Sequence, residues 1–125
     1  MALDATILES LAKGSDKDAW RVIIDRTLEI ASKPLAAGNA PSEVIKRDRE
    51  IGVLDHFLSS SAWDLWQSFG STVERNSDRL ARWWSEPYSA KAVLILDGLS
   101  LRELPWLLQG AKERGFTLHE VSANG

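Results

Sequence analysis

Apolar residues recur every three or four positions through the first two-thirds of the chain, which is the spacing of amphipathic helices. This pattern predicts helices over residues 3–13, 16–33, 41–58 and 62–84. Prolines, glycines and serines, which commonly end or cap helices, separate them. Ser15 and Asp18 have the spacing of a capping box, and the pair Gly70–Ser71 is where we expect the longest helix to kink. We therefore predict a helical region over residues 1–88.

The pattern changes at residue 91, where the run "KAVLILD" has no polar alternation. Such a run is typical of a β-strand that is covered on both faces. The next residues, 101–115, again have helical spacing, and 116–121 read as a second strand. Residues 89–125 thus predict a right-handed βαβ unit. The expected fold class is mostly α with a small α/β part: a helical N-terminal region followed by a βαβ unit with two parallel strands.

A sheet of two parallel strands leaves both of its edges unpaired and one face hard to cover. We therefore expect the chain to be a piece of a longer protein. If it is complete, the N-terminal helices must cover the sheet, or a partner chain, which can be a second copy in a homodimer, must finish it.

Composition narrows the class of protein. The chain has 125 residues, a formal net charge of −3 and no cysteine. Lack of cysteine excludes a disulfide framework, a thiolate metal site and a cysteine hydrolase, and it fits a cytoplasmic protein. An acidic balance does not support direct nucleic-acid binding. No apolar run approaches the roughly 20 residues that span a bilayer, so no membrane partner is expected.

Six tryptophans are unusual in a chain of this length. They lie at positions 20, 63, 66, 83, 84 and 106. Tryptophan is mostly buried in folded proteins, so the simpler prediction is an aromatic-rich core. The alternative is a partner-binding surface, because tryptophan is also enriched at interface hot spots.

Asp97 and Gly98 follow the first predicted strand directly. Aspartate in this position often caps the next helix, but Ser100 and Glu103 form a capping box of their own, which leaves Asp97 free. Ligands of open α/β sheets bind at the carboxyl ends of strands, and a carboxylate there is a good ligand for a divalent metal. Asp97 is therefore a candidate metal ligand, with Gly98 allowing the sharp turn beside it. The alternative is a simple Asp-Gly turn.

Other candidate sites are less specific. Three arginines at helical spacing, which could form a face that binds phosphate or a partner or could be a solvated face, are Arg75, Arg79 and Arg82. His119 is expected to be satisfied within the second strand, and Asp55–His56 to be an exposed polar pair. Neither a P-loop nor a dinucleotide-binding glycine motif occurs.

Residues 79–125, which include "RLARWWSEPYSAKAVLILDGLS" and "AVLILDGLSLRELPWLLQGAKERGFTLHEVS", resemble the PglZ family. That family belongs to the alkaline phosphatase superfamily. The resemblance implies that Asp97 coordinates one ion of a two-metal centre, with zinc or a similar divalent metal, and that Gly98 makes the turn beside it. The nucleophile, a Thr or Ser, and the remaining Asp and His ligands lie further along the chain in the family.

The resemblance thus implies the N-terminal portion of a PglZ-like metal-dependent phosphoesterase, inactive as this fragment alone. PglZ proteins occur in phage-defence systems of the BREX type, so the expected partners are other subunits of a defence complex or the remainder of the chain itself. The alternative is a non-enzymatic helical protein-interaction module, in which the tryptophans bind a partner subunit and Asp97 is a turn residue.

Overall fold

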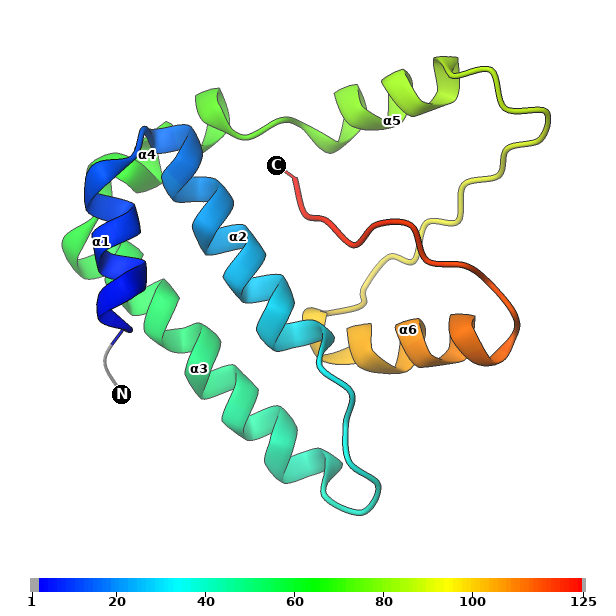
Figure 1. The fold of residues 1–125 in the computed structure, drawn as a ribbon, viewed down its shortest axis with the longest axis horizontal. Helices are drawn as coiled ribbons and strands as arrows, with labels where there is room; N and C mark the ends of the chain where they lie inside the picture. The colour runs from blue at the N-terminus through cyan, green and yellow to red at the C-terminus, as the bar shows by residue number, and fades with distance from the viewer. Residues whose placement is uncertain (1–2, 125) are drawn as a thin grey trace.

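A computed structural model of the chain describes residues 3–124 (Figure 1). Its elements, in chain order, are α1 (Ala5–Lys13), α2 (Asp16–Ser32), α3 (Ala40–Ser61), α4 (Trp63–Thr72), α5 (Asn76–Ser85), the 3₁₀ helix η1 (Leu101–Glu103) and α6 (Leu104–Glu113). No β-strand forms within the described residues. Among these residues, no helix is both long and apolar enough to cross a membrane.

The first two helices begin at side chains that cap them. Asp4 accepts a hydrogen bond of 2.8 Å from the Thr6 N–H. Ser15 and Asp18 form the predicted capping box, with the Asp18 N–H donating to Ser15 Oγ at 3.3 Å and the Ser15 N–H donating back to the Asp18 carboxylate. These bonds satisfy N–H groups that have no partner inside the helix.

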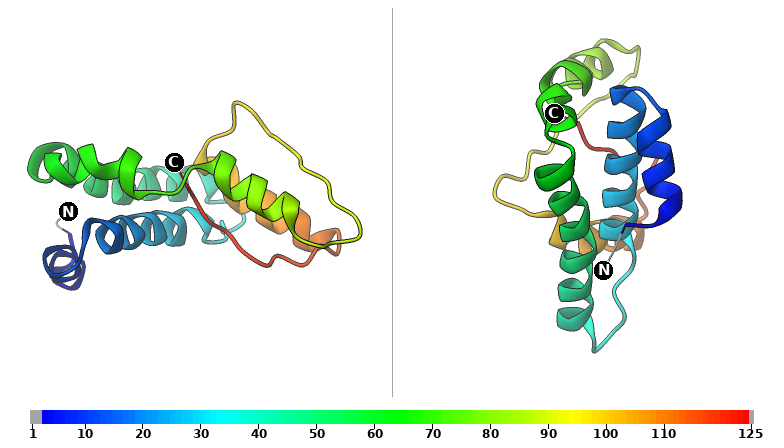
Figure 2. Two further views of the ribbon diagram at one scale, coloured as in Figure 1. Left: turned by 90° about the horizontal axis from the view of Figure 1, so that it is seen from above. Right: turned by 90° about the vertical axis from the view of Figure 1, so that its left-hand side faces the viewer.

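Helices α1 to α4 form a small core in two layers, with α1 and α2 in one layer and α3 and α4 in the other (Figure 2). Trp20, Ile23 and Leu58 are buried at the centre of this core. The Trp20 indole N–H donates to the Leu65 carbonyl oxygen at 3.1 Å and to the Ser68 hydroxyl at 3.2 Å. Trp20 therefore joins α2 to α4 through both its ring and its single donor.

The helix predicted over residues 62–84 is divided in two. It stops at Thr72 and resumes at Asn76, with Val73 and Arg75 in extended backbone conformations. The break therefore follows Gly70–Ser71, where we expected only a kink. Val73 packs against the core cluster, which fixes the end of α4 there, and its β-branched side chain favours extended backbone.

The prediction of a βαβ unit over residues 89–125 is wrong, because neither strand forms within the described residues. Residues 90–96 and 117–124 run in an extended course without backbone–backbone hydrogen bonds. The cause is the placement of α6, which packs against α2 instead of lying across the two segments (Figure 1). Without a covering helix or a paired neighbour, an apolar segment cannot form a stable sheet by itself.

The predicted helix between these two segments is confirmed. Ser100 and Glu103 form the capping box, and the first turn is the 3₁₀ helix η1, after which α6 begins at Leu104 with Pro105 in its first turn. Proline lacks an N–H, which explains why regular helix starts only here. Gly115 follows the helix with φ +78°, the left-handed conformation common after helix ends.

The tryptophans are distributed differently from the predicted aromatic core. Trp20 is buried, with 4% of its surface exposed, whereas Trp63 and Trp84 are each 57% exposed. Trp66 and Trp106 are about half exposed as well. The core interpretation therefore holds for Trp20, and most of the other indoles lie at the surface.

Candidate functional site

The Asp97–Gly98 turn lies between the extended apolar run and η1. Gly98 has φ +80°, a left-handed conformation that glycine adopts easily. No other group of the described residues lies close to it, so glycine is needed here for its backbone conformation and not for its small size. Glu103 accepts the Ser100 N–H at 2.8 Å, as the capping box requires. Asp97 is exposed, and among the described residues its carboxylate enters none of the hydrogen bonds or ion pairs. The carboxylate is therefore available to a ligand.

Lys91 fixes the amino-terminal side of this run. Its ammonium group donates to the carbonyl oxygens of Trp84 and Glu86 at the end of α5. It also lies 5.7–5.9 Å from the ring centroids of Trp83, Trp84 and Tyr88. Both contacts favour a cation, since a helix carboxyl end is partly negative and aromatic faces attract positive charge. Sequence reasoning missed this contact, although the aromatic pair before a lone lysine was a signal.

Arg102 fixes the carboxyl-terminal side. Its Nε donates to both Asp48 carboxylate oxygens, at 3.1 and 3.0 Å, and its Nη2 lies 2.8 Å from Oδ2. The hydrogen bond and the charge of Asp48 raise the pKa of Arg102 above its ordinary value. This pair ties η1 to α3 beside a cavity of about 400 Å³ that Val44, Ile51 and Leu101 help to line. The Asp97 turn therefore lies between Lys91, which contacts α5, and Arg102, which contacts α3.

The described residues do not fit a two-metal centre by themselves. No group of three or more His, Asp or Glu side chains lies together in residues 3–124. Two ions held about 3.5–4 Å apart need several ligands. Asp97 can supply one ligand to such a centre and no more.

The three predicted arginines do not form one continuous face. Arg75 precedes α5 as its N-cap residue, while Arg79 and Arg82 lie in the helix. Arg79 forms an ion pair with Glu120, and Arg82 donates to Glu74 at 2.9 Å. The Arg82 hydrogen bond and charge lower the pKa of Glu74 below its ordinary value. Both helical guanidinium groups are therefore already paired with carboxylates.

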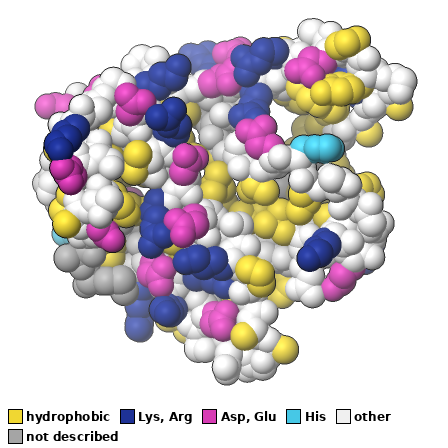
Figure 3. All heavy atoms as spheres, viewed as in Figure 1, with side chains coloured by type: hydrophobic (Ala, Val, Ile, Leu, Met, Phe, Trp, Pro, Cys, Tyr) yellow, Lys and Arg dark blue, Asp and Glu magenta, His cyan; other side chains and the backbone are white. Residues whose placement is uncertain are grey.

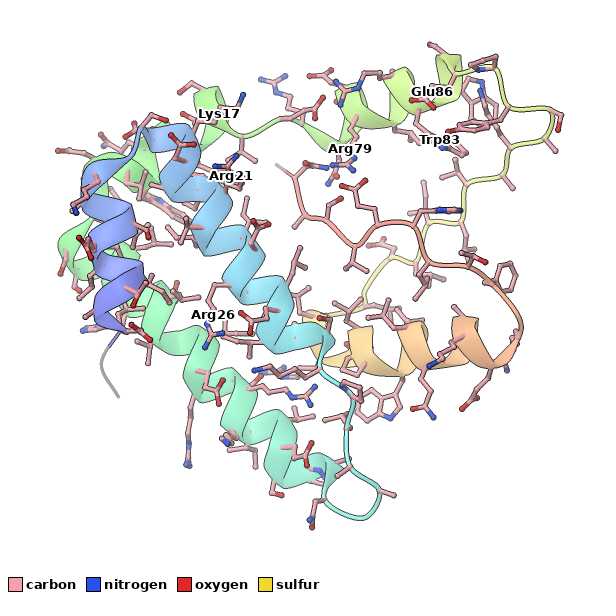
Figure 4. The ribbon with its side chains drawn as sticks, viewed as in Figure 1. Lys17, Arg21, Arg26, Arg79, Trp83 and Glu86 are labelled. Carbon is pink, nitrogen blue, oxygen red and sulfur yellow. The ribbon has the colours of Figure 1, made fainter. Side chains whose placement is uncertain are left out.

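A cavity of about 810 Å³ lies between α5 and residues 117–120. Its lining includes Arg79, Arg82, Trp83, Tyr88 and His119, so the structure brings the histidine of the predicted second strand to two of the predicted arginines. Figure 4 shows Arg79 directed from α5 toward the carboxyl-terminal segment, with Trp83 and Glu86 further along the chain. The cavity therefore places aromatic side chains beside charged groups that are already paired with one another.

Asp97 and the Asp55–His56 pair do not line this cavity. Asp55 and His56 are exposed on α3, as predicted. The candidate residues therefore fall into separate places: the Asp97 turn, the cavity beside α5, and the outer face of α3.

Comparison with known proteins finds no matching protein-family profile, curated protein or solved structure. The resemblance of residues 79–125 to the PglZ family consequently remains an expectation that only experiment can test. The structural fact that bears on it most directly is the free carboxylate of Asp97.

Proposed function

We propose that the chain is the N-terminal portion of a PglZ-like metal-dependent phosphoesterase in which Asp97 supplies one metal ligand. The observation that carries the proposal is the exposed, unengaged Asp97 carboxylate directly after an apolar run, on a turn that Gly98 allows. This is the position that the family resemblance gives to a ligand. Free aspartate oxygens are good donors to hard divalent cations.

The chain of residues 1–125 is expected to be inactive alone, because one carboxylate cannot assemble a two-metal centre. The remaining ligands and the Thr or Ser nucleophile would come from outside the described residues. The implied cofactor is zinc or a similar divalent metal. We place the protein in the cytoplasm, with the remainder of its own chain or other subunits of a BREX-type defence complex as partners.

The decisive experiment replaces Asp97 in the longer protein that carries this chain. Hydrolysis of p-nitrophenyl phosphate and bis(p-nitrophenyl) phosphate is measured together with bound metal, for the parent protein, Asp97→Asn and Asp55→Asn. Asp97→Asn should lose metal and reduce turnover by at least about 100-fold, because a metal ligand is gone. Asp55→Asn makes the same chemical change on the exposed face of α3 and should leave both unchanged.

Two outcomes would contradict the proposal. One is an Asp97→Asn protein that keeps its fold, its metal and its turnover. The other is hydrolysis by residues 1–125 alone that survives the same substitution, because the proposed centre is incomplete in that chain.

A second candidate is a non-enzymatic helical interaction module. It is favoured by large apolar side chains left at the surface, including Trp63 and Trp84 at 57% exposure. Tryptophan is enriched at the hot spots of protein interfaces. In this case Asp97→Asn would change nothing, and Trp84→Ala would weaken partner capture.

A further inference from the structure

Residues 92–96 combine apolar side chains with an unpaired backbone. Leu94 is 81% exposed and Ile95 is 79% exposed. Successive side chains of an extended segment point to opposite sides, so both faces of this one are apolar. Residues 90–99 take part in no backbone–backbone hydrogen bond. A β-strand is the partner that satisfies such a backbone, since it alone offers donors and acceptors at matching intervals.

The segment is complementary to itself when two copies run antiparallel. With Leu94 opposite Leu94 of the second copy, Lys91 faces Asp97, Ala92 faces Leu96 and Val93 faces Ile95. These pairs match opposite charges, a small with a large side chain, and two β-branched side chains. Cross-strand pairs of this kind stabilise a ladder.

Other antiparallel registers lose this match. A shift of two residues keeps the same faces together but places Lys91 opposite Ile95 or Leu99, and it removes both charge pairs. A shift of one residue exchanges the two faces of the strand. The two charge pairs between Lys91 and Asp97 therefore favour a second copy of this segment as the binding partner. They also favour the register that is centred on Leu94.

Both charged groups are available for this pairing. The Lys91 ammonium has three donors, of which the carbonyl oxygens of Trp84 and Glu86 take two. The Asp97 carboxylate is exposed. The anchors at Lys91 and Arg102 hold the ends of the run, which lowers the entropy lost when it pairs.

We propose that Lys91–Asp97 pairs with the same residues of a second copy, antiparallel and centred on Leu94, to form a dimer with twofold symmetry. This dimer does not rest on the phosphoesterase proposal. The Asp97 carboxylate that pairs with Lys91 is not free to ligate a metal, so the dimer belongs to chains whose metal centre is not assembled.

Sedimentation of the 125-residue chain over a range of concentrations tests the pairing through charge reversal. Lys91→Asp and Asp97→Lys each place like charges opposite one another twice per dimer, and each should weaken dimerisation by about tenfold. The double variant Lys91→Asp/Asp97→Lys restores both charge pairs but not the contacts of Lys91 with α5, so it should dimerise more tightly than either single variant. Lys46→Asp, which makes the same charge change on the exposed face of α3, should have no effect.

Cross-linking tests the register. The chain has no cysteine, so single cysteines report cleanly. Leu94→Cys meets its own copy in the proposed dimer and should form a disulfide readily under mild oxidation. Leu96→Cys meets residue 92, which puts the two cysteines four residues apart, or roughly 13 Å, beyond disulfide reach. Circular dichroism confirms that each variant keeps the helical fold.

Three results would overturn the dimer. The first is a chain that stays monomeric at every concentration, as it would if the run served only a different polypeptide. The second is a dimer that neither charge reversal weakens. The third is equal cross-linking of Leu94→Cys and Leu96→Cys.

Discussion

Residues 4–73 bury isoleucine and leucine side chains in a core, whereas residues 86–124 leave side chains of the same types exposed. Ile30 in α2 is 2% exposed, whereas Ile95 is 79% exposed. Leu54 in α3 is 3% exposed, whereas Leu94 is 81% exposed. Residue type therefore does not decide burial here, and the difference lies in spacing. Helical spacing gathers apolar side chains on one face that a neighbouring helix can cover, whereas consecutive apolar residues in an extended segment need a cover on both sides.

The two regions also differ in how the backbone is satisfied. A helix satisfies its interior N–H and C=O groups within itself, so α1 to α4 need partners only for their side chains. The extended segments make no backbone–backbone hydrogen bonds and need partners for both. Figure 3 shows hydrophobic side chains at the surface of one face of the molecule, including some beside the indentation between α5 and the carboxyl-terminal segment. The first region therefore satisfies most of its backbone within its own helices, whereas the extended segments of the second leave theirs without backbone partners within residues 3–124.

The largest expected effect separates two tryptophans. Trp20→Ala should destabilise the fold by about 3–5 kcal/mol, because it leaves a cavity among α2, α3 and α4 and removes two hydrogen bonds. Trp63→Ala removes the same side chain from a position that is 57% exposed and should cost less than about 0.5 kcal/mol. Urea unfolding followed by circular dichroism measures both. Equal losses of unfolding free energy in the two variants would contradict the burial of Trp20 in the core.

A smaller effect concerns the link between the regions. Arg102→Ala breaks the ion pair with Asp48, and η1 loses its tie to α3. Amide hydrogen exchange in α6 should accelerate several-fold, while exchange in α2 and α3 stays as it was. Arg49→Ala removes an exposed arginine of α3 and serves as the matched control. Exchange that accelerates equally in α2 and α3, or no change in α6, would contradict this role for the pair.

Local signals in the sequence predicted the helices well. The capping boxes at Ser15 and Ser100 each depend on residues within a few positions of one another. The strands could not be predicted in the same way. A run such as residues 92–96 shows which environment its side chains require, but it does not show whether the chain supplies that environment.

The candidate site shows the same limit. The sequence predicted that Ser100 and Glu103 would leave Asp97 free, because capping is local. It could not predict the anchor between Arg102 and Asp48, which lie 54 residues apart in the chain, in η1 and α3. Long-range contacts of this kind depend on the packing of whole elements and leave no short motif.

The smallest expected effect compares the two capping boxes as the pH falls. Hydrogen bonds from Ser15 lower the pKa of Asp18, and those from Ser100 lower the pKa of Glu103. Each depressed pKa contributes stability above the ordinary carboxyl pKa that is lost as the pH falls through the lowered value. Protonation of Asp18 should reduce global stability, because α2 carries Trp20, whereas protonation of Glu103 should loosen α6 alone. In urea unfolding at pH 7 and about pH 3.5, the cost of Asp18→Asn should therefore shrink with acid, while Glu103→Gln follows the parent at both values. A Glu103→Gln chain as destabilised as Asp18→Asn would show that residues 86–124 fold cooperatively with the core.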